Sequence, residues 1–434
     1  MKPDLGQEIE LTIDRLGING EGVGQWRGFT VFVFGALPTE RIIAKVYEVR
    51  KNFARAKILE RLDTSPHRAE PPCPLFGRCG GCQLMHLSYE QQLRAKQQRV
   101  VDALKRIAKI DIDVAPCIPS PQRLAYRNKI QLPVSANLRL GLYAHNTHDL
   151  IEIEKCYIHC ELGERVFQQV QELLKKHPAG NLRHVLIKTA VHTQQVLVIL
   201  VTHTNEPLTV LAEAIFESMP EIKGVMQNIN PAEGNVVLSN HFGTLVGKGA
   251  IEERLCNLTF KVSPASFFQV NPAQAENLYQ KVVQLAHLTG DERVLDAYCG
   301  VGTLSLILAQ HAKEVVGIES VAAAIEDAKE NAQRNQIHNA KFICGLAEES
   351  INTLEKIDVA VLNPPRKGCE SSFLEKLAHL KPKRIVYVSC DPATLARDLQ
   401  LLTQKGYTVN TVQPFDMFPQ TMHVESVSLL VISG

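Results

Sequence analysis

The sequence predicts an α/β protein with three parts: a small N-terminal β-barrel, an α+β central domain with a metal-binding type of cysteine loop, and a C-terminal Rossmann-like domain. Residues 1–60 alternate apolar and polar positions around glycine-rich turns, which is typical of short antiparallel strands. From about residue 275, short apolar strands alternate with helices, which indicates a doubly wound parallel sheet. We place the domains at 1–62, 63–270 and 271–434.

The bulk composition favours a soluble globular protein of several domains, since 45% of the 434 residues are hydrophobic and 21% are charged. No apolar run approaches the roughly 20 residues that span a bilayer, and the first residues lack the apolar core of a signal peptide. We therefore expect a cytoplasmic protein with no membrane partner. Because the formal net charge is only +1, any nucleic-acid surface must be a local patch.

For the first two domains, the sequence predicts helices and strands but few residues with a recognisable chemical role. In the barrel, basic residues gather between Arg50 and Arg61, and this cluster fits a solvated face as well as a nucleic-acid contact. Prolines and glycines interrupt the pattern over 64–82, which indicates a loop or a boundary. The central domain is expected to contain helices over 91–110, 161–177 and 208–217 and strands over 185–189 and 195–202.

A candidate cofactor loop opens the C-terminal domain. Asp296, Tyr298, Gly300 and Thr303 lie between a predicted strand and a predicted helix, where glycines let the backbone approach a ligand closely. The next strand ends at Glu319, and an acidic side chain at this place commonly binds ribose hydroxyls. The loop and Glu319 together predict a nucleotide-like cofactor.

A candidate nucleophile follows a later strand of the same domain. Cys390 ends the strand over 384–389, Asp391 suits a helix N-cap, and Pro392 suits the first helical position. A thiol just before a helix N-terminus is expected to have a lowered pKa. The carboxyl ends of the strands share one edge of the sheet, so Cys390, Asn363 and the cofactor loop are expected in one crevice. Glu425, near the start of the last strand, fits either a strand-end carboxylate or a member of this site.

The loop that joins the first two domains contains a candidate metal site. Cys73, Cys79 and Cys82 have spacings of five and two residues in a Pro/Gly-rich segment, which places several thiolates within reach of one metal centre. The fourth ligand must come from farther along the chain, from Cys156 or Cys160. Four thiolates bind either zinc or a [4Fe–4S] cluster.

Several segments together resemble the RNA uracil-C5 methyltransferase family, and the barrel resembles a TRAM domain in its GEGVG turn and NFARA segment. The family segments are Phe267–Asn271, Asp296–Thr303, Asn363–Gly368, Ser389–Pro392 and Phe418–Glu425. The resemblance covers the whole chain and is greatest to the iron–sulfur branch that acts on 23S ribosomal RNA. The family usually carries aspartate at position 363, so asparagine here can alter activity or substrate preference.

The resemblance implies a complete chemistry. Cys390 is the nucleophile that attacks C6 of a uracil, S-adenosylmethionine is the methyl donor, and Glu425 is the base that removes the C5 proton. Gln269, Tyr298, Thr303 and Glu319 fall at positions that contact the cofactor. For the candidate metal site, the resemblance implies a [4Fe–4S] cluster that is bound by Cys73, Cys79, Cys82 and Cys156.

The implied partner is RNA, with 23S ribosomal RNA first and transfer RNA as the alternative; no DNA partner is expected, and the chain is expected to be a monomer. A non-catalytic iron–sulfur protein that binds RNA is a further alternative. An amino-group methylase fits less well, because it has no evident need of Cys390 and Glu425.

Overall fold

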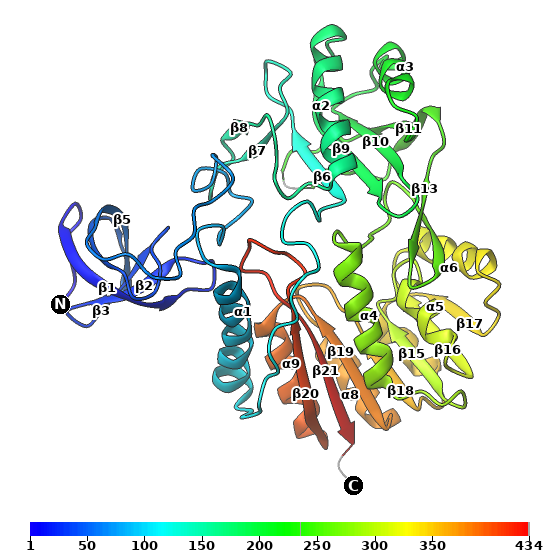
Figure 1. Cartoon of the computed structure of the whole chain (residues 1–434). Coiled ribbons are helices and arrows are strands. Elements are labelled where there is room, and N and C mark those ends of the chain that lie inside the picture. Colours follow the sequence, from blue (N-terminus) through cyan, green and yellow to red (C-terminus); the bar gives the residue numbers. More distant parts are fainter. Residues whose placement is uncertain (235, 433–434) are drawn as a thin grey trace.

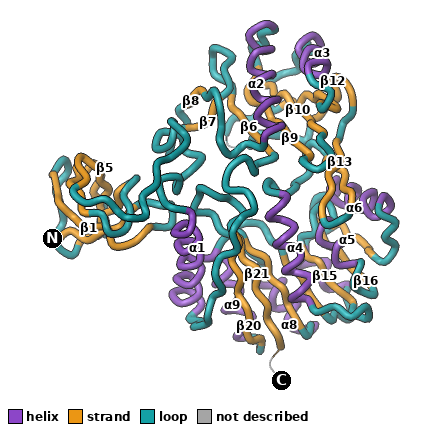
Figure 2. Tube along the Cα trace, in the orientation of Figure 1, coloured by secondary structure: helices purple, strands orange, loops and turns teal. Residues whose placement is uncertain are grey.

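The computed structural model describes residues 1–234 and 236–432, and in it three parts follow one another along the chain (Figure 1). The N-terminal barrel and the C-terminal sheet lie at opposite sides of the long helix α1, and the central domain lies above both (Figures 1 and 2). No helix of the described residues is long and apolar enough to cross a membrane.

The N-terminal part is a closed barrel with the strand order β1-β2-β3-β5-β4. Its strands are β1 (Glu8–Leu16), β2 (Gly22–Trp26), β3 (Phe29–Val33), β4 (Arg41–Val49) and β5 (Phe53–Arg61). Ile9, Leu11 and Ile13 of β1 are buried and the residues between them are exposed, because one face of a strand packs inward. A Cβ atom at Gly24 would lie 2.3 Å from the carbonyl oxygen of Thr12, so glycine is required where these strands approach. The predicted barrel is confirmed.

The central part is a five-stranded sheet with the order β12-β11-β10-β9-β6, in which only β10 and β11 are parallel. Its strands are β6 (Lys129–Pro133), β9 (Leu182–Ala190), β10 (Gln195–Thr202), β11 (Ile222–Ile229) and β12 (Phe242–Gly247). Helices α2 (Glu161–Lys176) and α3 (Thr209–Ser218) cover one face. The hairpin β7 (Gly141–Tyr143) and β8 (Leu150–Glu152) projects toward the cysteine loop, where the backbone of Cys79 bridges that of Ala144.

The C-terminal part is a seven-stranded sheet with the order β17-β16-β15-β18-β19-β21-β20, in which only β21 is antiparallel to its neighbours. The strands are β15 (Arg293–Ala297), β16 (Glu314–Glu319), β17 (Ala340–Cys344), β18 (Val359–Leu362), β19 (Arg384–Ser389), β20 (Tyr407–Phe415) and β21 (Glu425–Ile432). The helices are α4 (Pro272–Ala286), α5 (Thr303–Ala309), α6 (Ala322–Arg334), α7 (Ala347–Ser350), α8 (Ser371–Leu380) and α9 (Pro392–Gln404). The predicted Rossmann-like sheet is confirmed.

Two segments join the parts into one body. The hairpin β13 (Ile251–Leu255) and β14 (Leu258–Val262) has one end buried against the central sheet and the other in the core that α4 and α5 form on the C-terminal sheet. Helix α1 (Tyr89–Ala103) and the π-helical turn Leu104–Ala108 pack against the opposite face of the C-terminal sheet, together with α8 and α9. Core contacts therefore cross the expected boundary near residue 270. The division into domains at 1–62, 63–270 and 271–434 stays a prediction.

A buried ion pair fixes α1 to the C-terminal part. Lys96 on α1 and Asp416 just after β20 pair with each other, and both side chains are 0% exposed. Lys96 Nζ also donates a hydrogen bond to the carbonyl oxygen of Phe418 at 3.0 Å, and the Tyr89 hydroxyl donates to Asp416 at 2.8 Å. Because charged groups are costly to bury alone, this pair defines where α1 meets the segment between β20 and β21.

Replacing Lys96 with methionine should destabilise the fold by about 3–5 kcal/mol, because it leaves the Asp416 carboxylate buried without its cation. The free energy of unfolding in guanidinium chloride, followed by circular dichroism, measures the loss. The matched control is Lys105→Met, since this lysine is 69% exposed and lies 4.0 Å from Asp111; it should change stability by less than about 0.5 kcal/mol. Equal effects of the two substitutions would contradict the role of the buried pair.

Candidate active site

The carboxyl ends of four parallel strands meet at one edge of the C-terminal sheet. Strands β15, β16, β18 and β19 lead into the cofactor loop, Glu319, Asn363 and Cys390, respectively. Hydrogen bonds between the strand ends close this edge: the Gly300 amide donates to Glu319 Oε2 at 3.2 Å, and the Asn363 amide donates to the carbonyl oxygen of Ala297 at 3.2 Å. The topology therefore gathers the candidate residues that the sequence spreads over nearly 100 positions.

Asp296, at the end of β15, is fully buried beneath the cofactor loop. Ser305 Oγ on α5 donates to Asp296 Oδ2 at 2.5 Å, while Oδ1 has no hydrogen-bond partner. Burial raises the pKa of Asp296 to about 7, although the hydrogen bonds from Ser305 oppose the rise. A buried acceptor without a partner fits a ligand that brings a hydrogen-bond donor.

The loop between β15 and α5 has the backbone geometry of a close ligand approach. Tyr298, Gly300 and Gly302 all have positive φ angles, of 67°, 55° and 78°. Gly302 has no room for a side chain, since a Cβ atom there would lie 3.0 Å from the Cβ of Ala328. Thr303 is the first residue of α5 and is buried.

Glu319 contacts this loop, whereas Gln269 lies just before α4. The Glu319 carboxylate accepts hydrogen bonds from the amides of Gly300 and Val321, the latter at 2.9 Å, so it is held at the end of β16. Gln269 is buried just before α4, and Asn128 Nδ2 donates to its carbonyl oxygen at 3.2 Å. The ring of Tyr298 packs edge-on against Phe373 at 5.8 Å.

Cys390 and Glu425 lie opposite each other across two neighbouring strands. Ser389 on β19 pairs with Ser426 on antiparallel β21, so the residues one step beyond this pair face each other. Asp391 caps α9, because its carboxylate accepts hydrogen bonds from the amides of Ala393 at 2.9 Å and Thr394 at 3.0 Å. The expected start of α9 is thus present, and Cys390 precedes it directly.

The pKa of Cys390 differs from the one that the sequence predicts. Burial and the neighbouring Glu425 carboxylate raise the pKa of Cys390 to about 11, whereas a lowered pKa was predicted from the helix N-terminus. The prediction was wrong because desolvation and a like charge outweigh the helix dipole. Burial likewise raises the pKa of Glu425 to about 7. The Arg366 guanidinium lowers the pKa of both groups.

The cysteines of the candidate metal site lie near one another but do not form a compact group. Burial and the charges of Cys156, Cys79 and Cys73 raise the pKa of Cys82, and Cys156 and Cys73 also act on Cys79. Among the described residues, however, no three His, Cys, Asp or Glu side chains form a group that could hold a metal ion. The predicted metal centre is therefore not confirmed.

The two candidates for the fourth thiol ligand differ in their surroundings. Cys156 packs against the same apolar cluster as Cys73 and Cys82. Burial opposes ionisation of Cys156, yet hydrogen bonding to His159 and the charge of that ring lower its pKa. Cys160 is instead the N-cap residue of α2, buried beside Thr189. The interactions therefore group Cys156, rather than Cys160, with the other three thiols.

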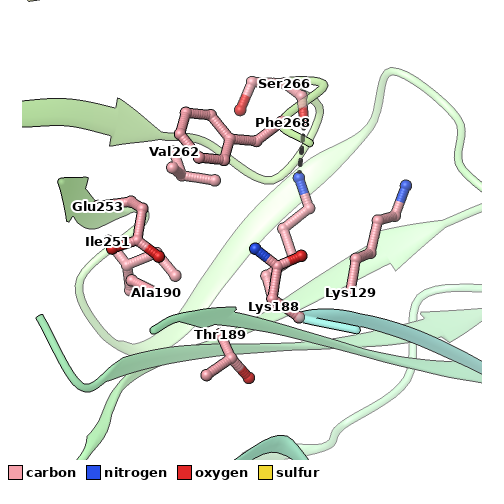
Figure 3. A pocket seen from close by; sticks show the side chains of 10 residues that line it. Lys129, Lys188, Thr189, Ala190, Ile251, Glu253, Val262, Ser266 and Phe268 are labelled. Atoms are coloured by element: carbon pink, nitrogen blue, oxygen red, sulfur yellow. Dashed lines mark hydrogen bonds between the residues drawn. The ribbon is translucent and has the colours of Figure 1, made fainter. Parts of the chain in front are cut away.

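Lys188, a buried lysine that the sequence patterns did not indicate, supports the loop before Gln269 (Figure 3). Its Nζ donates to the carbonyl oxygens of Ser263 and Ser266, both at 2.9 Å, beside a cavity of about 20 Å³. Burial lowers the pKa of Lys188 to about 7, and the charge of the cross-strand neighbour Lys129 adds to the effect. The available signal was a lysine that directly follows the apolar run 185–187 of β9. Arg366 was also missed, although it belongs to the segment that begins at Asn363.

The fold and the crevice define a class of protein: an α/β methyltransferase domain joined to an N-terminal RNA-binding type of barrel. The model of the TRAM domain matches residues 4–59, and that of the tRNA (Uracil-5-)-methyltransferase family matches residues 88–432. The chain belongs to the tRNA (uracil-5-)-methyltransferase family. The expected family and the TRAM domain are therefore confirmed.

Individual relatives agree with this assignment. An RNA methyltransferase of Clostridium tetani is 43% identical over 100% of this chain and 99% of its own length. One of Listeria innocua is 42% identical over 98% of both chains. Among solved structures, the Pyrococcus abyssi tRNA (uracil-54, C5)-methyltransferase in complex with S-adenosyl-L-homocysteine has a TM-score of 0.78 and 28% identity, covering 98% of this chain and 100% of its own.

Proposed function

We propose that this protein transfers a methyl group from S-adenosylmethionine to C5 of a uridine in RNA, with 23S ribosomal RNA as the first candidate substrate. The observation that carries the proposal is the opposition of Cys390 and Glu425 at the edge of the sheet where the cofactor loop lies. Transfer RNA is the alternative, because a relative with a TM-score of 0.78 acts on a tRNA uridine.

The crevice offers groups that suit the methyl donor. The unpartnered Oδ1 of Asp296 and the carboxylate of Glu319 are acceptors for an amino group and for ribose hydroxyls. Gln269, Tyr298, Gly300, Thr303 and Asn363 are the further residues that we assign to this site. S-adenosylmethionine, when bound there, supplies the methyl group as an electrophilic carbon.

Cys390 and Glu425 perform the steps on the base. The Cys390 thiol gives its proton to water, and the resulting thiolate forms a bond to C6. This addition makes C5 nucleophilic enough to accept the methyl group, so one hard step becomes two easier ones. Glu425 then removes the proton from C5, the bond between sulfur and C6 breaks, and the double bond of the ring and the thiolate are restored. Arg366 favours the charged forms of both groups, because it lowers their pKa values. The base must leave its stack or already be unpaired to reach Cys390.

A transfer assay tests the reaction and the substrate together. The protein is incubated with methyl-labelled S-adenosylmethionine and, separately, with unmodified 23S, 16S and transfer RNA, and the nucleosides are then analysed. We expect label in 5-methyluridine from 23S RNA. Label from transfer RNA alone would replace the proposed substrate, and cofactor binding without label in any RNA would favour a non-catalytic RNA-binding protein.

Replacing Glu425 with glutamine should trap the enzyme on its substrate, because the C5 proton then stays and the bond from Cys390 to C6 cannot break. A band that contains both protein and labelled RNA should survive denaturing electrophoresis. The matched control is the double substitution Cys390→Ala with Glu425→Gln, which keeps the altered carboxylate position but has no thiol. A stable band from the double variant, or none from Glu425→Gln, would count against these roles.

We also assign a [4Fe–4S] cluster to Cys73, Cys79, Cys82 and Cys156. Cys73 and Cys156 lie close enough to raise the pKa values of both Cys79 and Cys82, and four thiolates are the ligand set of a [4Fe–4S] cluster. The cluster would stabilise the loop between the barrel and the central domain, and it takes no part in the steps above.

Anaerobically purified protein should be brown and contain about four iron atoms per chain. Cys79→Ser should lose most of the iron, because it removes a thiolate ligand. Cys344→Ser is the matched control, since this cysteine is exposed at the end of β17, away from the cluster. Elemental analysis and the visible spectrum provide the measurement; colourless protein that contains zinc would contradict the assignment.

A further inference from the structure

The turn between β1 and β2 of the barrel contacts the segment that leads to Glu425. A Cβ atom at Gly20 would lie 3.1 Å from Cγ of Met422. Leu16, at the end of β1, packs on a small apolar cluster that contains Met422 and Leu84. The barrel thus contacts the segment between β20 and β21, which leads to Glu425. Figure 1 shows this segment in red, close to the barrel.

This turn presents an isoleucine to solvent. Ile18 is 70% exposed, although it lies beside the buried Met422. Its turn is held in one shape, because the Asn19 amide donates to Glu21 Oε2 at 3.1 Å and the Gly17 amide donates to the carbonyl oxygen of Glu21 at 2.7 Å. A single exposed apolar residue is ordinary on a surface. A role for Ile18 can therefore be inferred only from the surface features next to it.

Two hollows of the surface meet at Ile18. One, of about 690 Å³, lies between the barrel, α1 and the start of α9, and it extends to Asp391, the neighbour of Cys390. The other, of about 400 Å³, lies between the barrel, the cysteine loop and the β7–β8 hairpin, and it extends to His423. Ile18, Arg99 and Met422 line both hollows. A chain that crosses from one hollow to the other passes over Ile18.

Both hollows suit a nucleic-acid strand. The larger one is lined by four arginines and three aspartates: Arg15, Arg94, Arg99, Arg106, Asp14, Asp102 and Asp391. Arg94 pairs with Glu90 and Arg106 pairs with Asp102, whereas Arg99 donates to the carbonyl oxygen of Met422. Arg15 and Arg99 are therefore the arginines without a carboxylate partner among the described residues that line this hollow. The smaller one has no acidic side chain among the described residues that line it, and it contains the rings of Tyr143 and His145. Cations for phosphates and rings for bases are the groups that bind single-stranded RNA.

We propose that Ile18 is an apolar wedge, which fills the space left in the RNA base stack when the target uridine turns toward Cys390. The inference rests on the proposed function, since it requires an RNA base to leave its stack. Apolar side chains serve this purpose in other nucleic-acid complexes, where they enter between bases and compensate for lost stacking. Here the wedge stands on a rigid turn between the two parts of the strand path.

The test compares Ile18→Ala with Ile18→Leu, which keeps an apolar side chain of equal size. Leu5→Ala is the matched surface control, because Leu5 is 72% exposed on the same barrel and lines neither hollow. Methyl transfer is measured on unmodified 23S and transfer RNA transcripts, either folded with Mg²⁺ or heat-denatured without it. Binding of S-adenosylmethionine and the melting temperature are measured in parallel.

We expect Ile18→Ala to lower kcat/KM about tenfold on folded RNA and less than about twofold on denatured RNA, with cofactor binding and stability unchanged. Ile18→Leu and Leu5→Ala should behave as the unaltered protein does. Activity of Ile18→Ala near that of the unaltered protein on folded RNA, or an equal loss on folded and denatured RNA, would overturn the wedge alone. Failure of the unaltered protein to label any RNA would overturn the proposed function, and the wedge with it.

Discussion

The ion pair of Lys96 and Asp416 is the constraint on which the arrangement of the site depends. Neither charge can be buried without the other, so α1 has to lie against the segment that follows β20. That segment is then fixed further, because Arg99 on the same helix donates to the carbonyl oxygen of Met422 at 2.6 Å. It ends at Glu425, so a helix that precedes the strands of the central sheet in sequence positions the proposed base of the C-terminal domain.

The same segment is where all three parts of the molecule meet. The Tyr126 hydroxyl, which comes from the chain leading into the central sheet, donates to the carbonyl oxygen of Pro419 at 3.1 Å. The amides of Gln83 and Leu84, from the cysteine loop, both donate to the carbonyl oxygen of Gln420 at 2.9 Å. Hydrogen bonds from residues outside the C-terminal domain leave this irregular backbone little freedom. These contacts fix the segment that leads to Glu425 to the parts of the chain that precede the C-terminal sheet.

Burial sets the chemistry of the proposed catalytic pair. It raises the pKa of Glu425 to about 7, which places a base near neutral pH. It also raises the pKa of Cys390 to about 11, so the free protein holds a neutral thiol rather than a reactive thiolate. Arg366 is the neighbouring charge that opposes both shifts.

The sequence by itself determined the barrel, the parallel sheet and the residues at its carboxyl edge, because the period of apolar residues and the glycine, Asp391 and Pro392 signals are local. It did not show that α1 packs in the C-terminal core, that Lys188 supports the loop before Gln269, or that Cys390 has a raised pKa. These features depend on residues that are far apart in the chain. Lys96 pairs with Asp416, 320 positions away. Cys390 is desolvated beside Glu425 only once β19 and β21 are paired. Local patterns specify elements, whereas burial and long-range partners arise from tertiary packing.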